Sequence, residues 1–144
     1  MNSTPTFRAS LLQTARLIND EINIILLPYQ LNSSFWQALY VIHKKEGCTS
    51  IEIAEYLNVS KPSIAKRINA LIDLDLLEQI PTEDKRQKKF ILSTKGEVLY
   101  KECSSLIDEF ENNLLKDFLD NDISTTKKLL TQLSQKILSS NQGN

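Results

Sequence analysis

The segment from Thr49 to Leu92 limits the folds open to this chain more than any other part of it. Two short helical patterns meet there at a tight connection, residues 57–60. A basic stretch, residues 84–89, then separates two runs with the composition of β-strands. Few arrangements accommodate two helices and a charged hairpin in so short a segment, and one of them is a helix-turn-helix followed by a hairpin.

The first helix of the pair is predicted to begin after Thr49, which forms a capping box with Glu52. In such a box the threonine hydroxyl accepts the glutamate amide, and the glutamate carboxylate accepts the threonine amide. Ile53, Ala54 and Leu57 then fall on one side of the helix and predict a buried face.

The second helix is predicted to begin after Ser60, a favoured N-cap, with Pro62 in the first turn, where its missing N–H needs no partner. Apolar residues at helical spacing predict one buried face: Ile64, Ile68, Leu71 and Ile72. The opposite side is small, polar and basic: Lys61 at the start, Pro62, Ser63, Lys66, Asn69 and Ala70, with Arg67 on the flank. Such groups suit the base edges and phosphates of a major groove. For an isolated helix, an ordinary solvated face is the simpler interpretation.

The hairpin that follows favours a DNA-binding function over an ordinary solvated surface. Residues 76–80 and 89–92 have strand composition, and the segment between them gathers four cations: Lys85, Arg86, Lys88 and Lys89. Like charges so close together repel unless an anion neutralises them. An arginine at a hairpin tip can enter the narrow minor groove while neighbouring lysines meet phosphates. A basic tip after two such helices is a sharper indication of DNA binding than either part alone.

This order of parts resembles the winged helix-turn-helix of the MarR family of bacterial transcription regulators. The resemblance is carried by Thr49 with Glu52-Ile53-Ala54, Val59-Ser60-Lys61-Pro62-Ser63-Ile64, Leu71 with Leu76-Leu77, Asp84-Lys85-Arg86 (the D-x-R form), and Leu92-Ser93-Thr94-Lys95-Gly96. It spans residues 7–138, with specific motifs only between Thr49 and Gly96. The sequence departs from the family at Asn58 and Asp75, which are commonly glycine, and at Ser93, which is usually threonine. Asn and Asp both tolerate a left-handed backbone better than most residues.

The resemblance implies a mainly α fold with a small β-wing and a terminal-helix dimerisation region. Residues 1–144 would form a single domain, in which 33–96 are the winged helix-turn-helix DNA-binding lobe and 7–32 and 97–140 are dimerisation helices. The terminal helices carry broad apolar stripes that a small winged lobe cannot cover, which also predicts a two-fold homodimer. An intramolecular bundle is the alternative.

Helical spacing also predicts where the terminal helices begin and end. The first begins at Phe7 and ends near Pro28. A long helix is capped by Ser93 and keeps its apolar spacing to Leu119, and Ser124 caps the last helix.

The distribution of charge agrees with this organisation better than the total does. The net charge is −1, but residues 33–96 hold ten cations and eight anions, whereas residues 97–144 hold five cations and eight anions. The surplus of cations lies where the groove-reading unit is predicted.

Composition indicates a soluble, cytoplasmic protein. Hydrophobic residues make up 41% and charged residues 24% of the chain. No basic-then-apolar leader is present, and the longest apolar run, residues 24–27, is too short to span a bilayer. Two cysteines provide no disulfide framework.

No catalytic or metal constellation stands out in the sequence. The chain has one histidine, no nucleophile motif and no glycine-rich phosphate loop, so we expect no enzyme activity and no cofactor. One histidine and two separated cysteines do not form a metal-ligand set, and no metal is expected.

Site roles follow from the resemblance to the family. The expected DNA-binding residues are Ser63, Lys66 and Arg67 at the major groove with Pro62 and Asn69 beside them, Arg86 at the minor groove, and Ser50, Lys61, Lys88 and Lys89 at the backbone. Relatives often bind small aromatic or phenolic effectors between the dimerisation helices and the winged lobe. The candidate lining is Tyr29, Phe35, Trp36, Tyr40 and Phe110, although an aromatic stripe at helical spacing is also typical of a core.

Cys48 leaves a redox signal as an open alternative. It lies close to a helix N-terminus, where a thiolate is stabilised, whereas Cys103 lies on an apolar stripe and is predicted to be core. The function predicted is therefore a dimeric repressor of transcription that binds double-stranded DNA at a pseudo-palindromic operator and is released by a small-molecule or oxidative signal. The alternative is a winged-helix module that docks another protein and has lost DNA binding.

Overall fold

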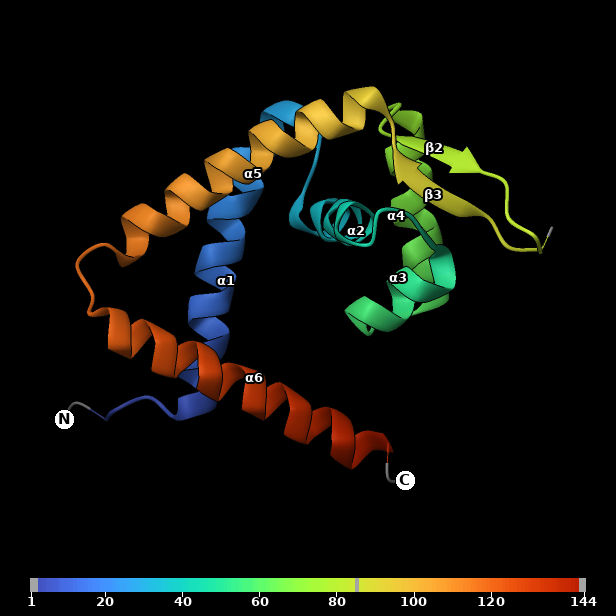
Figure 1. The fold of residues 1–144 in the computed structure, drawn as a ribbon. Coiled ribbons are helices and arrows are strands. Elements are labelled where there is room, and N and C mark those ends of the chain that lie inside the picture. The colour runs from blue at the N-terminus through green and yellow to red at the C-terminus, as the bar shows by residue number, and fades with distance from the viewer. Residues whose placement is uncertain (1–2, 85, 143–144) are drawn as a thin grey trace. The chain divides into compact units, whose positions relative to one another are not determined.

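The computed structural model describes residues 3–84 and 86–142. By contacts the chain divides into two compact units, Met1–Ile107 and Asp108–Asn144. The elements in order are α1 (Phe7–Leu26), a short 3-10 helix (Leu27–Tyr29), α2 (Ser33–Lys44), β1 (Cys48–Thr49), α3 (Ser50–Leu57), α4 (Lys61–Asp73), β2 (Leu77–Ile80), β3 (Lys89–Leu92), α5 (Thr94–Leu115) and α6 (Asp120–Gln142). The predicted fold class, mainly α with a small β-wing, is confirmed (Figure 1).

Side-chain caps determine where the central helices begin. The capping box predicted at α3 is present, since Thr49 Oγ1 accepts the Glu52 amide at 3.3 Å and Glu52 Oε1 accepts the Thr49 amide at 3.0 Å. Ser60 Oγ accepts the Ser63 amide at the start of α4 at 3.3 Å. Asn32 Oδ1 accepts the Phe35 amide at the start of α2 at 2.9 Å. Each cap satisfies an amide that the first turn of a helix leaves without a partner.

The three strands form one antiparallel sheet in the order β1-β3-β2. Strand β2 pairs with β3 so that Leu77 lies opposite Leu92. The two-residue strand β1 was not predicted, because its only pairing partner is distant in sequence: Cys48 lies opposite Phe90. The hairpin of β2 and β3 projects from the helices and forms the wing (Figure 1).

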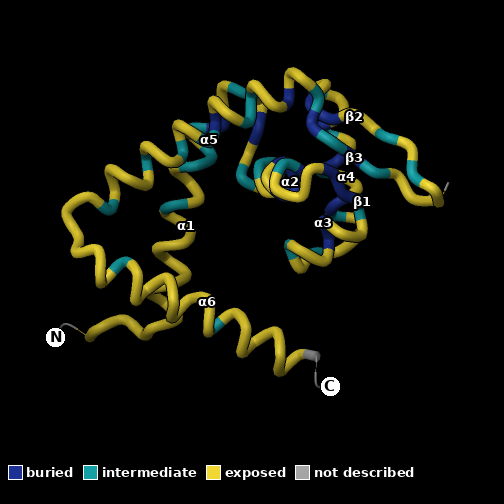
Figure 2. Tube along the Cα trace, in the orientation of Figure 1, coloured by how far each residue is buried: buried dark blue, intermediate teal, exposed yellow. Residues whose placement is uncertain are grey.

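The core of the first unit lies around α2, which packs against α3, α4 and β3. Figure 2 shows buried residues gathered in these elements, while most of α1 is exposed. The predicted inner face of α4 is confirmed for Ile64, Ile68 and Leu71, which are nearly inaccessible. The prediction was wrong for Ile72, which is 41% exposed. Ile72 comes directly after Leu71, so the rotation of the helix turns it toward the edge of the face.

A compact hydrogen-bonded junction joins α4, the wing and α5. Ser93 Oγ donates to the Asp75 carbonyl at 2.7 Å and accepts the Gly96 amide at 2.9 Å, and the Ser93 amide donates to the Leu76 carbonyl at 2.9 Å. A Cβ on Gly96 would lie 2.2 Å from the Leu76 carbonyl oxygen, so only glycine fits. The serine that replaces the family's usual threonine therefore still caps α5.

The predicted boundary between the last two helices was wrong. Helix α5 ends at Leu115, and α6 begins at Asp120, so Ser124 lies inside α6 rather than before it. The carbonyl of Leu119 accepts the Ile123 amide at 3.1 Å, which starts the helix earlier. Asp120 and Asp122 occupy the first turn of α6, where negative charge complements the helix dipole. None of the described helices is both long enough and apolar enough to cross a membrane.

Two turns around α4 use left-handed backbone at residues other than glycine. Asn58 has φ 55° at the end of α3, and Asp75 has φ 61° after α4. Both are positions where glycine is common in the family, as the departures from its pattern suggested. The Cβ of a non-glycine residue makes this conformation costly.

Replacing Asp75 with glycine should therefore stabilise the fold. We expect Asp75→Gly to raise the free energy of unfolding by about 0.5–1 kcal/mol, because the left-handed strain is removed. Asp75→Ala is the matched control, since it removes the same carboxylate but keeps a Cβ, and it should be less stable than Asp75→Gly. Urea unfolding of the three proteins measures the difference, and an Asp75→Ala protein as stable as Asp75→Gly would contradict the assignment of strain.

Candidate DNA-binding surface

Helix α4 presents the predicted polar side to solvent. Lys61, Pro62, Lys66 and Asn69 are exposed, while Ser63 is half-buried beside its cap. The opposite side carries the buried isoleucines and leucine that pack into the lobe. One helix thus separates an apolar inner face from an outer face with hydroxyl, amide and ammonium groups, the types that meet base edges and phosphates.

The N-terminus of α3 lies close to two lysines. The backbone hydrogen bond from Thr49 is the main cause that lowers the pKa of Glu52, and the charges of Lys45 and Lys89 add to it. Lys89 starts β3 and is paired opposite Thr49, so the base of the wing adjoins this helix end. Ser50, the first residue of α3, is half-buried there. The amides of Thr49 and Glu52 are already bonded in the capping box, so the two lysines are the groups here that suit a phosphate.

A small network of hydrogen bonds orders the tip of the wing. Thr82 Oγ1 lies within hydrogen-bonding distance of the carbonyls of Asp84 and Gln87, and the Gln87 amide donates to the Asp84 carbonyl at 3.1 Å. Asp84 Oδ1 accepts the Arg86 amide at 3.0 Å. The aspartate of the D-x-R form therefore organises the turn that carries its arginine. Lys85, predicted to belong to the basic tip, lies outside the described residues.

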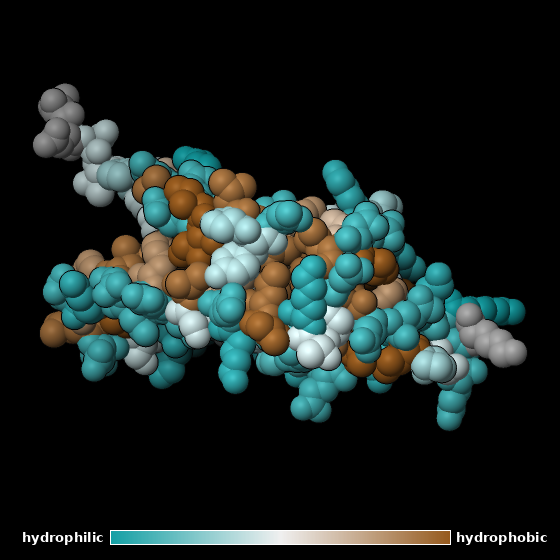
Figure 3. Space-filling model, turned by 90° about the horizontal axis from the view of Figure 1, so that it is seen from above, coloured by the Kyte–Doolittle hydropathy of each residue, from teal (hydrophilic) through white to brown (hydrophobic). Residues whose placement is uncertain are grey.

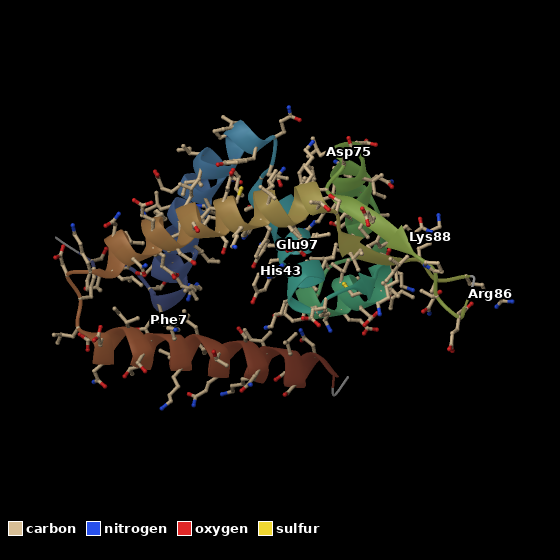
Figure 4. All side chains as sticks on the ribbon, turned by 45° about the horizontal axis from the view of Figure 1, so that its top comes forward. Phe7, His43, Asp75, Arg86, Lys88 and Glu97 are labelled. Carbon is tan, nitrogen blue, oxygen red and sulfur yellow. The ribbon has the colours of Figure 1, made fainter. Side chains whose placement is uncertain are left out.

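Figure 4 shows Arg86 at the far end of the wing, with its side chain directed away from the helices. Arg86 and Lys88 are exposed, and Lys89 at the wing base is half-buried. Within the part of the chain that the structure describes, no carboxylate lies within 4.0 Å of the charged groups of Arg86, Lys88, Lys61 or Lys66, because the one ion pair joins His43 and Glu97. These four cations of the predicted surface are thus available to an external anion.

Arg67 is placed differently from its exposed neighbours. Its Nη1 donates to the carbonyl of Ser34 at 3.2 Å and to Oε1 of Gln37 at 3.3 Å, both on α2. The side chain is half-buried between the two helices. In this structure its guanidinium is engaged by the protein.

The five aromatic residues of the predicted effector cleft are divided between the two units. Tyr29, Phe35 and Trp36 are partly buried against the core, and Phe110 belongs to the second unit. Tyr40 lines an open hollow of about 600 Å³ together with His43, Lys44, Gly47, Ile91, Glu97 and three further residues. Three of the five aromatic residues therefore pack against the core, which was the alternative to a ligand cleft.

Sequence reasoning missed the contacts that join α2 to α5. Tyr100 stacks between two rings of α2, with centroids 4.9 Å from Trp36 and 3.9 Å from His43. His43 Nδ1 is shielded from water, makes no aligned hydrogen bond and lies 3.3 Å from Oε2 of Glu97 (Figure 4). Only the crossing of two helices distant in sequence creates this cluster, so local patterns gave no signal of it.

A second missed cluster lies where α2 and α3 end. Lys44 Nζ donates to the Tyr56 hydroxyl at 3.0 Å and lies 5.7 Å from the ring centre of Tyr40. This hydrogen bond is the main cause that raises the pKa of Lys44 and lowers the pKa of Tyr56.

Cys48 does not have the environment that the sequence predicted. Its side chain is entirely buried, and burial raises the pKa of the thiol to about 11, with a further contribution from the Glu52 charge. The predicted stabilisation of a thiolate was wrong, because desolvation outweighs the nearby helix end. Cys103 is core, as predicted, and burial raises its pKa to about 11 as well. Among the described residues, no group of three or more His, Cys, Asp and Glu could hold a metal ion.

Comparison with known proteins identifies the family. The MarR family model matches residues 29–87, which cover α2, α3, α4 and β2 and end just before β3. The uncharacterized HTH-type transcriptional regulator YwoH of Bacillus subtilis (strain 168) is 35% identical over 124 residues, covering 86% of this chain and 90% of that protein.

Solved structures share the fold at low sequence identity. S. aureus MepR in complex with DNA superposes with a TM-score of 0.83 at 20% identity, covering 93% of this chain and 99% of that chain. A mutant of MarR from E. coli complexed with operator DNA gives a TM-score of 0.74 at 20% identity, covering 90% of this chain and 99% of that chain. Both the family and YwoH are transcriptional regulators. With the capped helix pair, the D-x-R turn and the wing in place, this chain belongs to the MarR family of transcriptional regulators.

Proposed function

We propose that this regulator is a homodimer that binds a pseudo-palindromic operator in double-stranded DNA and represses transcription there. The observation that carries the proposal is the set of exposed cations on α4 and the wing that, among the described residues, have no carboxylate partner. Cations left unpaired on a folded surface raise the affinity for a polyanion, because each phosphate contact releases counterions.

The proposed contacts divide by chemistry. The outer face of α4, with Ser63, Lys66, Asn69 and Pro62, enters the major groove, and Arg86 reaches the minor groove. Ser50, Lys61, Lys88 and Lys89 contact the phosphate backbone. Support comes from the exposure of the α4 face and of Arg86 at the wing tip. Two proteins of similar fold, MepR and a mutant of MarR, are bound to DNA in their structures.

Exposed apolar side chains support the dimer. On α1, Phe7 and Leu12 are each 59% exposed and Ile24 is 63% exposed. On α6, Leu129, Leu130, Ile137 and Leu138 also lie exposed. Figure 3 shows apolar side chains reaching the molecular surface among polar ones. Large exposed apolar patches are uncommon on monomers, and a second copy of the chain is the partner that the terminal-helix prediction names.

The hollow beside Tyr40 is a candidate place for a small-molecule signal. The hollow beside Tyr40 is bounded by the end of α2, by β3 and by Glu97 in the first turn of α5. A molecule held there would contact the wing strand and the long helix at once. An oxidative signal through Cys48 would first require local opening, because the thiol is buried.

The DNA proposal is tested by removing the wing arginine. We expect Arg86→Ala to weaken binding to a duplex selected from a random pool by about 10- to 100-fold, because one groove contact is lost. Lys101→Ala is the matched control, since it removes an equally exposed positive charge from α5 and should leave affinity nearly unchanged. Fluorescence anisotropy at several salt concentrations measures both variants. Equal affinities of Arg86→Ala and the wild type would contradict the wing assignment, and absence of any duplex binding in dilute salt would overturn the function.

The dimer is tested by charging the exposed face of α1. Leu12→Glu should convert a species of twice the chain mass into monomers, because a carboxylate cannot be buried in an apolar interface without a partner. Gln13→Glu, which adds the same charge at the adjacent exposed polar position, should leave the dimer intact. Sedimentation equilibrium distinguishes the two. A wild-type protein that sediments as a monomer at micromolar concentration would contradict the proposal.

A separate prediction follows from the burial of the Cys48 thiol. Because a raised pKa keeps Cys48 protonated at neutral pH, iodoacetamide should modify it about 10- to 100-fold more slowly in the folded protein than in denaturant. Peptide mass spectrometry separates Cys48 from Cys103. Rapid modification of Cys48 in the folded protein, together with loss of DNA binding after peroxide, would instead favour the oxidative signal.

A further inference from the structure

Arg67 is distinguished from the other cations of α4 by what it already binds. Nη1 of a guanidinium carries two of its five N–H groups, and two acceptors on α2 lie within reach of it. These acceptors are the Ser34 carbonyl at 3.2 Å and Oε1 of Gln37 at 3.3 Å. Lys66, the preceding residue, is exposed and has no carboxylate partner among the described residues.

The acceptors belong to a part of α2 that is itself held in place. Ser34 lies in the first turn of α2, where Asn32 caps the helix through the Phe35 amide at 2.9 Å. The neighbouring Ser33 amide donates to Oδ1 of Asn23 on α1 at 2.8 Å. A sequence of hydrogen bonds thus runs from α1 through the start of α2 to the middle of α4.

The hydrogen bonds from Arg67 to α2, called the Arg67 bridge below, restrict the orientation of α4 on α2 more than apolar packing alone does. Helices α2 and α4 are in contact, and both contribute apolar side chains to the core, whose packing has no directional requirement like that of a hydrogen bond. Hydrogen bonds weaken steeply when their angles change, so a forked donor on one helix and two acceptors on the other favour one orientation.

We propose that Arg67 is a positioning residue, which holds the recognition helix α4 at a fixed orientation on α2 and contacts neither base nor phosphate. This inference rests on the proposed DNA-binding function and replaces the groove-facing role that the sequence predicted for Arg67. Base readout depends on the orientation of α4, whereas phosphate contacts depend mainly on charge. Arg67 therefore contributes to the preference for the operator over other DNA.

Substitution of Arg67 distinguishes positioning from contact. We expect Arg67→Met to lower operator affinity by about 10-fold while affinity for unrelated duplex and the slope of log affinity against log salt stay nearly unchanged. Lys66→Met is the matched control, because it removes the adjacent charge from the exposed face. It should weaken both duplexes and reduce the salt slope by about one unit. If Arg67→Met behaves like Lys66→Met, Arg67 contacts DNA and the proposal is overturned.

Gln37→Glu provides an independent test that keeps the arginine in place. The new carboxylate should hold the guanidinium more firmly on α2, so operator affinity should stay within about threefold of wild type. If Arg67 reads DNA, the carboxylate competes for it, and affinity should fall by more than about tenfold. The same substitution in the Arg67→Met background measures the effect of the added negative charge alone, and the competition must disappear there.

Thermal unfolding tests the hydrogen bonds from Arg67 to α2 separately from the proposed DNA-binding function. Arg67→Met and Gln37→Ala should lower the melting temperature by less in combination than the sum of the two single effects, because each removes the same hydrogen bond. Additive losses would overturn the bridge even if DNA binds normally. Coupled losses in a protein that binds no duplex at any salt concentration would overturn both the DNA-binding function and the role of Arg67 in operator preference.

Discussion

The stability of the winged lobe depends on the burial of α2 among its neighbours. Ala38, Leu39, Val41 and Ile42 are almost completely shielded from water. Burying each of the larger side chains stabilises the fold by about 1.5–3 kcal/mol, so this helix supplies a large part of the stability of a small lobe. Because α2 packs against α4 and also against β3, it determines where the polar face of α4 and the wing are held. The surface that would meet DNA is therefore fixed from behind by one helix.

Features of the fold that depend on near neighbours in sequence could be predicted, and those that depend on distant partners could not. The capping box of Thr49 and Glu52 and the Ser60 cap follow from groups three residues apart. Strand β1 requires Phe90, more than forty residues away from Cys48, and no local pattern marks it. The same limit explains the thiol of Cys48, since its sequence position near a helix end says nothing about the desolvation that raises its pKa. The start of α6 was misplaced because aspartates occur both in turns and in first helical turns.

The sequence predicts which cations lie on the candidate surface, but it does not predict which of them are bonded to other groups of the protein. The cluster of cations from Lys61 to Lys89 is visible in the sequence, although the whole chain has a net charge of only −1. Which cations are committed to the protein depends on the fold. Lys44 donates to Tyr56 and Arg67 donates to α2, whereas Lys66 and Arg86 have no carboxylate within ion-pair distance among the described residues. A count of charges would treat all four alike, but only the uncommitted ones are free to release counterions from a polyanion.

This division between committed and uncommitted cations bears on how a regulator of this fold obtains specificity. Contacts with phosphates give affinity for any duplex, and they tolerate small rotations of the helix that makes them. Contacts with base edges require donors and acceptors to meet within a few tenths of an ångström, so they depend on how rigidly α4 is held. On the proposed role of Arg67, specificity would reside partly in a residue that never touches DNA, because its bonds to α2 would set the angle at which Ser63 and Asn69 are presented. On the proposed function, two adjacent cations would therefore act differently: exposed Lys66 would meet DNA in the major groove, whereas Arg67, bonded to α2, would set the orientation of the helix without touching DNA.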